Sequence, residues 1–374
     1  MTAELDRALP AVRLANEAVW EAVLPRLREL VVRGDFTLGT AVDEFEQAAA
    51  AHFGSPWAVA LSSGTAALQL ALRAAPLSAP ARVALPANTF FATFEAVLAA
   101  GHVPVLVDHD EDLLLSAATM AGLEVDAVVP VHLYGLPVDM TGLMAQAAEQ
   151  GWWVLEDASQ AHGAEVGGRP VGSLGHAAAF SAYPTKNLGA WGDAGFVTGI
   201  DPRLEDLLRS LRHHGHGGPG RHVLVGGTHR MDSIQALVLT EKLSRLEEEV
   251  RRRREVAAWY REALDGLDLA LPGDRGDRSH AYHQFVVRVP RRAEVRARLA
   301  EQGIETAVHY PVPVHRQPAA QGRCAVPRPL HRAEQSAAEV LSLPMRPGLR
   351  PGDVERVATG LRAALRSGTQ LALP

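Results

Sequence analysis

The feature that most constrains the fold is an alternation of short apolar runs with helical stretches between residues 57 and 199. Seven runs are apolar at nearly every position, and they cover residues 57–61, 83–85, 104–107, 127–133, 152–155, 177–180 and 195–198. Continuous apolarity is typical of strands buried on both faces. Helical spacing separates the first five runs, at 65–74, 91–100, 117–122 and 140–150. This order predicts an α/β fold with a mostly parallel seven-stranded sheet. The last two runs leave no room for a strong helix, so one of them is expected to be antiparallel.

The segments on either side of this region complete the predicted architecture. Helical patterns precede it at 14–33 and 42–53, and a long one follows at 232–265. Beyond about residue 270, a strand at 283–289 is followed by helical patterns at 292–302, 334–341 and 354–364. We therefore predict two domains. Residues 1–240 form an N-terminal segment and the large domain, and residues 241–374 form a bridging helix and a smaller C-terminal α/β domain.

Composition excludes several classes of protein. An apolar share of 47% in 374 residues predicts a sizeable core. The net charge of 37 − 43 = −6 argues against a nucleic-acid partner. Cys324 is the single cysteine, so an internal disulfide and a cysteine-rich metal site are excluded, and no metal is expected. The chain shows no secretory signal pattern and no apolar run long enough for a bilayer. We therefore expect a cytoplasmic protein with no membrane partner.

One lysine stands where a ligand is expected. In open α/β sheets ligands bind beyond the carboxyl ends of the strands. Lys186 follows the run 177–180 within the stretch Ser-Ala-Tyr-Pro-Thr-Lys-Asn-Leu-Gly at residues 181–189. Small and turn-forming neighbours allow the backbone to approach a cofactor closely. A solvated lysine on an ordinary turn is the alternative, and the other strand ends decide between the two.

Three further strand ends carry polar or aromatic residues. A helix is expected to begin after the first run, at Ser63, Gly64 and Thr65. This helix start could bind an anion, or its hydroxyls could simply cap the helix. Asp157 follows the run 152–155 and could cap a helix or face a cation, while Glu156 should point to the opposite side. Phe90 is either a core aromatic or a face for stacking on a ring.

Together, an anion site, a carboxylate, an aromatic face and a lysine match the requirements of pyridoxal phosphate (PLP). The lysine carries this cofactor as a Schiff base, and the carboxylate keeps the pyridine nitrogen protonated. The order of these residues resembles the DegT/DnrJ/StrS family of sugar aminotransferases, which are PLP enzymes of fold type I. The stretches that share this resemblance are residues 34–39, 45–46, 86–93, 156–163, 183–186, 309–313 and 341–344.

The resemblance implies a role for each candidate residue. Lys186 is the cofactor-bonded lysine and the acid/base that moves the proton, and Asp157 is the partner of the pyridine nitrogen. Gln160 contacts the 3-hydroxyl of the ring, and Phe90 stacks on the ring. The residues expected at the cofactor phosphate are Ser63, Gly64, Thr65 and Ser181. His309 and Tyr310 lie near the substrate, unless Pro311 and Pro313 simply make that loop rigid.

A departure from the family pattern concerns the neighbouring subunit. Members of the family that this sequence resembles work as homodimers with shared active sites. In them an asparagine of a Gly-x-Asn-x-Arg stretch reaches the partner's cofactor phosphate. Here the stretch at 226–230 reads Gly-Gly-Thr-His-Arg, so Thr228 takes that place with a shorter side chain. The cross-subunit contact is therefore in doubt, whereas the fold is not.

The reaction that the resemblance implies has two stages. L-Glutamate (or glutamine) gives its amino group to PLP, and pyridoxamine phosphate (PMP) then passes it to the keto group of a nucleotide-linked sugar, expected to be a TDP sugar. The product is an aminosugar nucleotide for an antibiotic or another glycosylated product. The spelling of residues 186–193 favours amination at C3, while C4 and a pentose substrate stay open. A cyclitol aminotransferase is the nearest alternative, and a non-catalytic regulator on the same fold is a more distant one.

Overall fold

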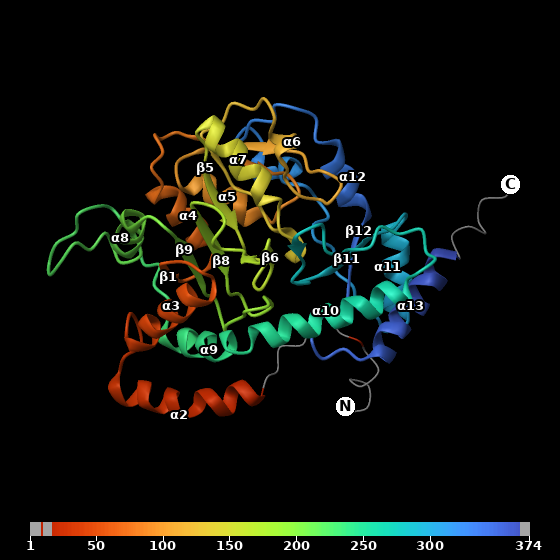
Figure 1. Ribbon diagram of the computed structural model, residues 1–374, viewed down its shortest axis with the longest axis horizontal. Helices are drawn as coiled ribbons and strands as arrows, with labels where there is room; N and C mark the ends of the chain where they lie inside the picture. Colours follow the sequence, from red (N-terminus) through yellow and green to blue (C-terminus); the bar gives the residue numbers. More distant parts are fainter. Residues whose placement is uncertain (1–8, 10–16, 367–374) are drawn as a thin grey trace.

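The computed structural model describes residue 9 and residues 17–366, and a seven-stranded sheet lies at its centre (Figure 1). The strands follow the order β1 (Trp57–Leu61), β9 (Gly195–Gly199), β8 (Ala177–Ser181), β5 (Trp153–Asp157), β4 (Ala127–Val128), β2 (Arg82–Pro86) and β3 (Val103–Val107). β9 is antiparallel to both β1 and β8, and the remaining neighbours are parallel. The predicted mostly parallel sheet with one antiparallel strand is confirmed.

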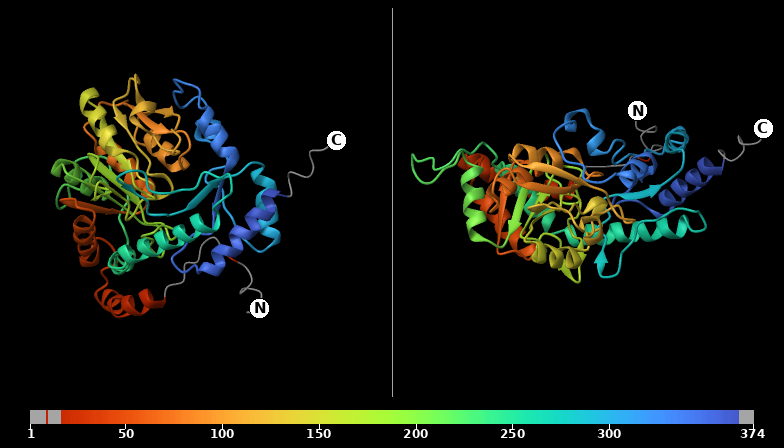
Figure 2. Two further views of the ribbon diagram at one scale, coloured as in Figure 1. Left: turned by 45° about the vertical axis from the view of Figure 1, so that its right-hand side comes forward. Right: turned by 90° about the horizontal axis from the view of Figure 1, so that it is seen from above.

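Helices cover both faces of this sheet, which makes three layers (Figure 2). One face packs against α4 (Gly64–Ala74), α5 (Phe91–Ala99) and α8 (Pro202–Leu211). The other face packs against α2 (Glu17–Arg33), α3 (Thr40–His52), α7 (Met140–Gln150) and α9 (Ser233–Leu243). The strands are buried on both sides, as their continuous apolarity predicts. Across residues 17–366, no helix has the length and apolarity needed to cross a membrane.

The C-terminal part has its own apolar cluster beside the sheet. Helix α10 (Leu246–Ala263) leads into it, and β11 (Phe285–Arg288) pairs antiparallel with β12 (Val340–Leu343). The helices of this part are α11 (Arg292–Glu301), α12 (His331–Glu339) and α13 (Pro351–Arg366). Val250 on α10 packs with the sheet's cluster, whereas Tyr260, three turns later, packs with the C-terminal cluster. One helix therefore joins the two parts (Figure 1).

Three predicted elements differ from the structure. The strand expected at 127–133 is only two residues long, because Pro130 has no N–H for the ladder, and the chain continues into the 3₁₀ turn η1 (Leu133–Gly135). The helix expected at 334–341 ends at Glu339, where pairing with β11 takes over. The pattern at 232–265 is two helices, α9 and α10, separated at residues 244–245.

The helix expected at 117–122 is the short capped turn α6 (Ala117–Met120). The structure also contains short strands that the sequence pattern did not reveal. A small sheet joins β6 (Glu165–Val166), β7 (Arg169–Pro170) and β10 (Arg278–Ser279). Strands of two residues carry too few positions to show a period of two. Residues 14–16 of the first predicted helix lie outside the described residues.

Candidate active site

The carboxyl ends of β1, β5 and β8 meet at one edge of the sheet, and the predicted residues gather there. A Cβ built on Gly64 would lie 2.5 Å from the Ser181 Cβ, so the turn after β1 touches the end of β8. A Cβ on Gly195 would lie 2.4 Å from the carbonyl carbon of Ser63. Only glycine permits both approaches. The two expected phosphate segments, 63–65 and 181, are therefore in direct contact.

Lys186 lies in a tight turn after β8. Its backbone N–H donates to the Tyr183 carbonyl at 2.8 Å, and the Ala190 N–H donates to the Ala182 carbonyl at 2.8 Å. Gly189 packs against the Pro184 carbonyl, with no room for a Cβ. Burial lowers the pKa of Lys186 to about 8, and the negative charge of Asp157 opposes this shift. Lys186 is thus no ordinary surface lysine, and a substantial share of its amine is neutral near pH 8.

Asp157 is buried at the end of β5, with 4% of its surface exposed. Its Oδ2 accepts a hydrogen bond of 2.8 Å from Thr93 Oγ1, and its Oδ1 accepts from the Ser159 N–H at 3.2 Å. Thr93 in turn is 2.8 Å from Thr89 Oγ1. The sequence analysis missed this threonine pair, although Thr93 ends the stretch 86–93 used for the resemblance. The pair holds the carboxylate on the face of the sheet that carries α5.

The helix that begins at Gly64 presents its first turn to the same edge. Ser63 Oγ accepts from the Ala66 N–H at 3.1 Å, so this hydroxyl caps α4. Thr65, one position inside the helix, is partly buried. The N–H groups of a first helical turn have no partner within the helix and favour an anion. The capping role and an anion site are therefore compatible in this turn.

The ring of Phe90 is 56% exposed, which excludes the core-aromatic interpretation. It precedes α5, and its centroid lies 5.5 Å from that of Tyr310. The Tyr310 hydroxyl accepts a hydrogen bond of 3.0 Å from Gln160 Nε2. The predicted Phe90, Gln160, His309 and Tyr310 are thus brought into one neighbourhood, although 150 residues separate Gln160 from Tyr310.

Tyr134 connects these residues, and the sequence analysis gave it no role. Its N–H donates to Gln160 Oε1 at 2.7 Å, and its hydroxyl donates to the His309 carbonyl. It adopts a φ of 61°, which is rare for a residue with a large side chain. The sequence signal was its place in the Tyr134-Gly135 pair after an apolar run.

The charge of Lys186 acts on three histidines, of which His162 and His283 are buried and His309 is half-buried. Burial, with a smaller effect of the Lys186 charge, lowers the pKa of His309 to about 4 and that of His162 to about 3. The same causes hold the pKa of His283 well below its ordinary value. All three rings are therefore neutral at neutral pH. His309 Nδ1 lies 2.8 Å from Ser342 Oγ, which ties the loop to β12.

Thr228 lies in a segment that passes beside the turn after β1, because the His229 carbonyl accepts from the Ser62 N–H at 2.9 Å. It is exposed, and its Oγ1 lies 3.1 Å from His214 Nε2. The segment after α8 extends away from the body of the subunit (Figure 1). The Thr228 hydroxyl is therefore paired with His214 within the subunit, and its contact with a cofactor phosphate stays a prediction.

Comparison with known proteins supplies independent evidence. The model of the DegT/DnrJ/EryC1/StrS aminotransferase family matches residues 19–362. A UDP-N-acetyl-3-dehydro-α-D-glucosamine 3-aminotransferase of Acidithiobacillus ferrooxidans is 41% identical over 372 residues, which cover 96% of this chain and 99% of that protein. A dTDP-3-amino-3,4,6-trideoxy-α-D-glucose transaminase of Streptomyces venezuelae is 41% identical over 336 residues, or 88% of each chain.

A solved structure bears on the cofactor. NtdA of Bacillus subtilis, solved with bound PMP, is 29% identical, with a TM-score of 0.87 over 96% of this chain and 84% of that chain.

Proposed function

Because the chain belongs to the DegT/DnrJ/EryC1/StrS aminotransferase family, we propose that it transfers the amino group of L-glutamate (or glutamine) to the C3 keto group of a nucleotide-linked sugar. The enzyme is a PLP-dependent sugar aminotransferase that acts on nucleotide ketosugars. We propose in addition which carbon of the sugar is aminated and which amino acid donates the amino group. Amination at C3 is supported by the names of the two relatives, one of which uses a UDP sugar and the other a dTDP sugar.

The residues at the sheet edge fit PLP on two observations. Gly64 has no space for a Cβ beside Ser181, so backbone N–H groups rather than side chains face the edge where a phosphate would be held. Phe90 is 56% exposed at the same edge as the buried Asp157 and Gln160, which leaves its ring free for stacking. When bound, the cofactor supplies a carbonyl for the amine and an electron sink for the carbanion-like state.

Lys186 and Asp157 divide the work of the protein. The neutral Lys186 Nζ, available because burial lowers its pKa to about 8, takes a proton from Cα of the amino donor and later delivers one to the sugar carbon. Asp157, fixed by Thr93, holds a negative charge for the pyridine nitrogen. Gln160 and Tyr310 orient the ring hydroxyl and the substrate side of the site.

We also propose a homodimer with shared sites. The exposed side chains of Trp20 and Trp191 are in ring contact at 5.9 Å, and Phe36 is 48% exposed. Apolar surface of this kind is typical of an interface. The exposed Thr228 can then contact the cofactor phosphate of the partner's site, as the family pattern implies.

The decisive observation is the partly buried Lys186 with its lowered pKa beside the buried Asp157. We expect purified protein to be yellow with PLP, to lose this colour with L-glutamate, and to regain it with a UDP- or dTDP-linked 3-ketosugar. Size-exclusion chromatography with absorbance and light-scattering detection measures the cofactor colour and the number of subunits in one experiment. A protein that stays colourless with PLP refutes the assignment as a PLP enzyme. Colour that returns only with a 4-ketosugar refutes amination at C3. A molar mass equal to that of one subunit refutes the proposed homodimer. Equal activity with a free keto-inositol would favour the cyclitol alternative.

A further inference from the structure

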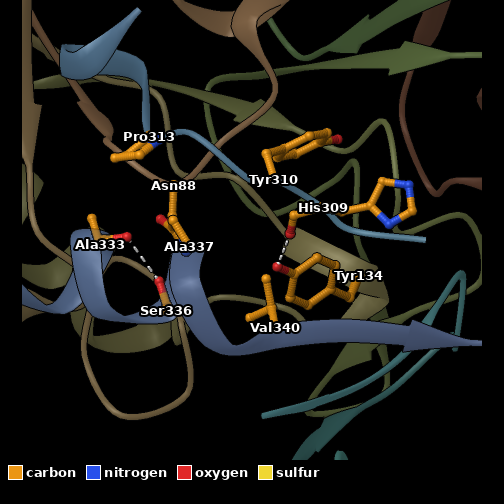
Figure 3. Close-up of a pocket in the computed structure, with 9 residues that line it drawn as sticks. All are labelled: Asn88, Tyr134, His309, Tyr310, Pro313, Ala333, Ser336, Ala337 and Val340. Atoms are coloured by element: carbon orange, nitrogen blue, oxygen red, sulfur yellow. Dashed lines mark hydrogen bonds between the residues drawn. The ribbon is translucent and has the colours of Figure 1, made fainter. Parts of the chain in front are cut away.

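We propose that the pocket between Asn88 and helix α12 holds a hydrogen-bond-donating substituent of the acceptor sugar, with Asn88 Oδ1 as its main acceptor. This inference rests on the proposed function. The pocket has room for about one water-sized group and lies next to Tyr310 (Figure 3). Its polar lining comes from Asn88, Tyr134, His309, Tyr310 and Ser336, and the sequence analysis assigned no role to Asn88, Tyr134 or Ser336.

Asn88 is the side chain that most clearly points to a ligand. It is 8% exposed and lies just beyond the end of β2, two residues before Phe90. Its Nδ2 donates to the Leu113 carbonyl at 2.9 Å, which fixes the orientation of the amide. Its Oδ1 has no hydrogen-bond partner in residues 17–366. A buried acceptor without a partner is costly, so a ligand that donates to it gains affinity.

Ser336 presents a second acceptor to the pocket. His109 Nδ1 lies 2.6 Å from the Asp110 carbonyl, which can only accept, so Nδ1 carries the proton of this ring. Burial lowers the pKa of His109, which keeps the ring neutral and makes Nε2 an acceptor. Ser336 Oγ lies 2.9 Å from this Nε2 and 3.2 Å from the Ala333 carbonyl. Either way the hydroxyl proton is used within the protein, and only lone pairs face the pocket.

Tyr134 adds a third acceptor. Its hydroxyl proton goes to the His309 carbonyl (Figure 3), so its oxygen can only accept from a ligand. Tyr310 differs, because its hydroxyl accepts from Gln160 and keeps a proton to donate. Tyr310 lies at the end of the pocket that contacts Phe90. Most polar groups that line the pocket are therefore hydrogen-bond acceptors. The Tyr310 hydroxyl is a donor and lies at the end of the pocket toward the candidate cofactor site.

His309 also lines the pocket, and the Tyr134 hydroxyl occupies its carbonyl. The remaining lining is apolar and small. It consists of Pro313, Ala333, Ala337 and Val340. No lysine or arginine lines the pocket. A carboxylate would meet oxygen lone pairs without a cation, so neither carboxylate of glutamate fits. A sugar hydroxyl or an acetamido N–H fits, since it donates to Asn88 and is flanked by small apolar groups. Asn88 is thus a specificity residue for the second stage of the reaction only.

The test measures the two stages separately by absorbance. For Asn88→Leu we expect kcat/KM with the 3-ketosugar to fall about tenfold, the value of one hydrogen bond, while bleaching by L-glutamate keeps its rate. Equal loss in both stages overturns the inference, because Asn88 would then act on the site as a whole. No loss in the second stage also overturns it.

Asn88→Asp is the matched control for the bond to Leu113. The aspartate keeps an acceptor toward the pocket but loses the amide donor. We expect it to retain most of the ketosugar activity that Asn88→Leu loses. If both variants lose the same activity, the bond to Leu113 explains the effect and the subsite is refuted.

Substrate analogues identify the substituent. In one series each hydroxyl of the 3-ketosugar is replaced by fluorine, which cannot donate, and in another the acetamido nitrogen is methylated. One analogue should be about tenfold poorer for the wild-type enzyme and equal to the parent sugar for Asn88→Leu. If no analogue behaves in this way, the inference fails while the proposed function stands. If the wild-type enzyme aminates no nucleotide 3-ketosugar, both fail together.

Discussion

Each face of the sheet at the end of β5 buries a carboxylate, Glu156 on one and Asp157 on the other. Glu156 accepts from the backbone N–H groups of Gly172, Leu174 and Gly175 at 2.7–3.1 Å. It also accepts from His132 Nε2 at 3.1 Å, since His132 Nδ1 is occupied as an acceptor from the Val138 N–H.

Asp157, by contrast, accepts only from Thr93 and from the Ser159 N–H among the hydrogen bonds of the described residues. Its charge also acts on Lys186. Two consecutive acids therefore differ because strand geometry sends them to opposite faces. The hydrogen bonds to Glu156 fill its acceptor positions and hold the loop at 172–175. Asp157 keeps acceptor positions for a group in the candidate cofactor site.

The largest effect in this comparison is expected at Asp157. Asp157→Asn keeps the shape but removes the charge, so we expect turnover to fall about a thousandfold. The urea midpoint should change little, because the asparagine Oδ1 can still accept from the Ser159 N–H while Thr93 accepts from the amide and donates to Thr89. Steady-state rates and unfolding curves measured on the same preparation check this. Turnover within about threefold of wild type would mean that Asp157 is structural, like Glu156.

Glu156→Gln should show the opposite pattern. The amide presents a donor to N–H groups that already need acceptors, so we expect the free energy of unfolding to fall by about 2–3 kcal/mol. The folded fraction should keep nearly normal turnover at low temperature. Urea unfolding followed by fluorescence measures the first effect and steady-state kinetics the second. A stable but inactive variant would contradict the division between the two faces.

The smallest effect concerns the pH dependence of PLP uptake by the apoenzyme. Uptake needs the neutral Lys186 amine, so a pKa of about 8 predicts a rate that rises with pH and levels off above that value. The rise from about pH 7 to about pH 8 should be about fivefold. Because the charge of Asp157 raises this pKa, Asp157→Asn should move the curve to lower pH, and Glu156→Gln should leave it in place. A curve still rising steeply at about pH 10 would show an ordinary lysine.

Local patterns predicted the sheet because its strands are buried on both faces and therefore read as unbroken apolar runs. The same logic found Lys186 and Asp157, which follow such runs directly. It failed at 334–341, where Val340 begins β12 by pairing with β11 about 50 residues earlier, a contact that a local window does not contain. The division into 1–240 and 241–374 stays a prediction, since α10 packs with both parts.

The sequence by itself determined the α/β order, the lysine at the end of β8 and the separation of Glu156 from Asp157, because periodicity along a strand is local information. Only the tertiary structure decided which distant groups meet them. Tyr310 reaches Gln160 and Phe90, and Tyr134 joins Gln160 to the His309 carbonyl. These contacts depend on how the C-terminal part packs against the sheet, and that packing is set by the summed burial of many side chains rather than by any one stretch.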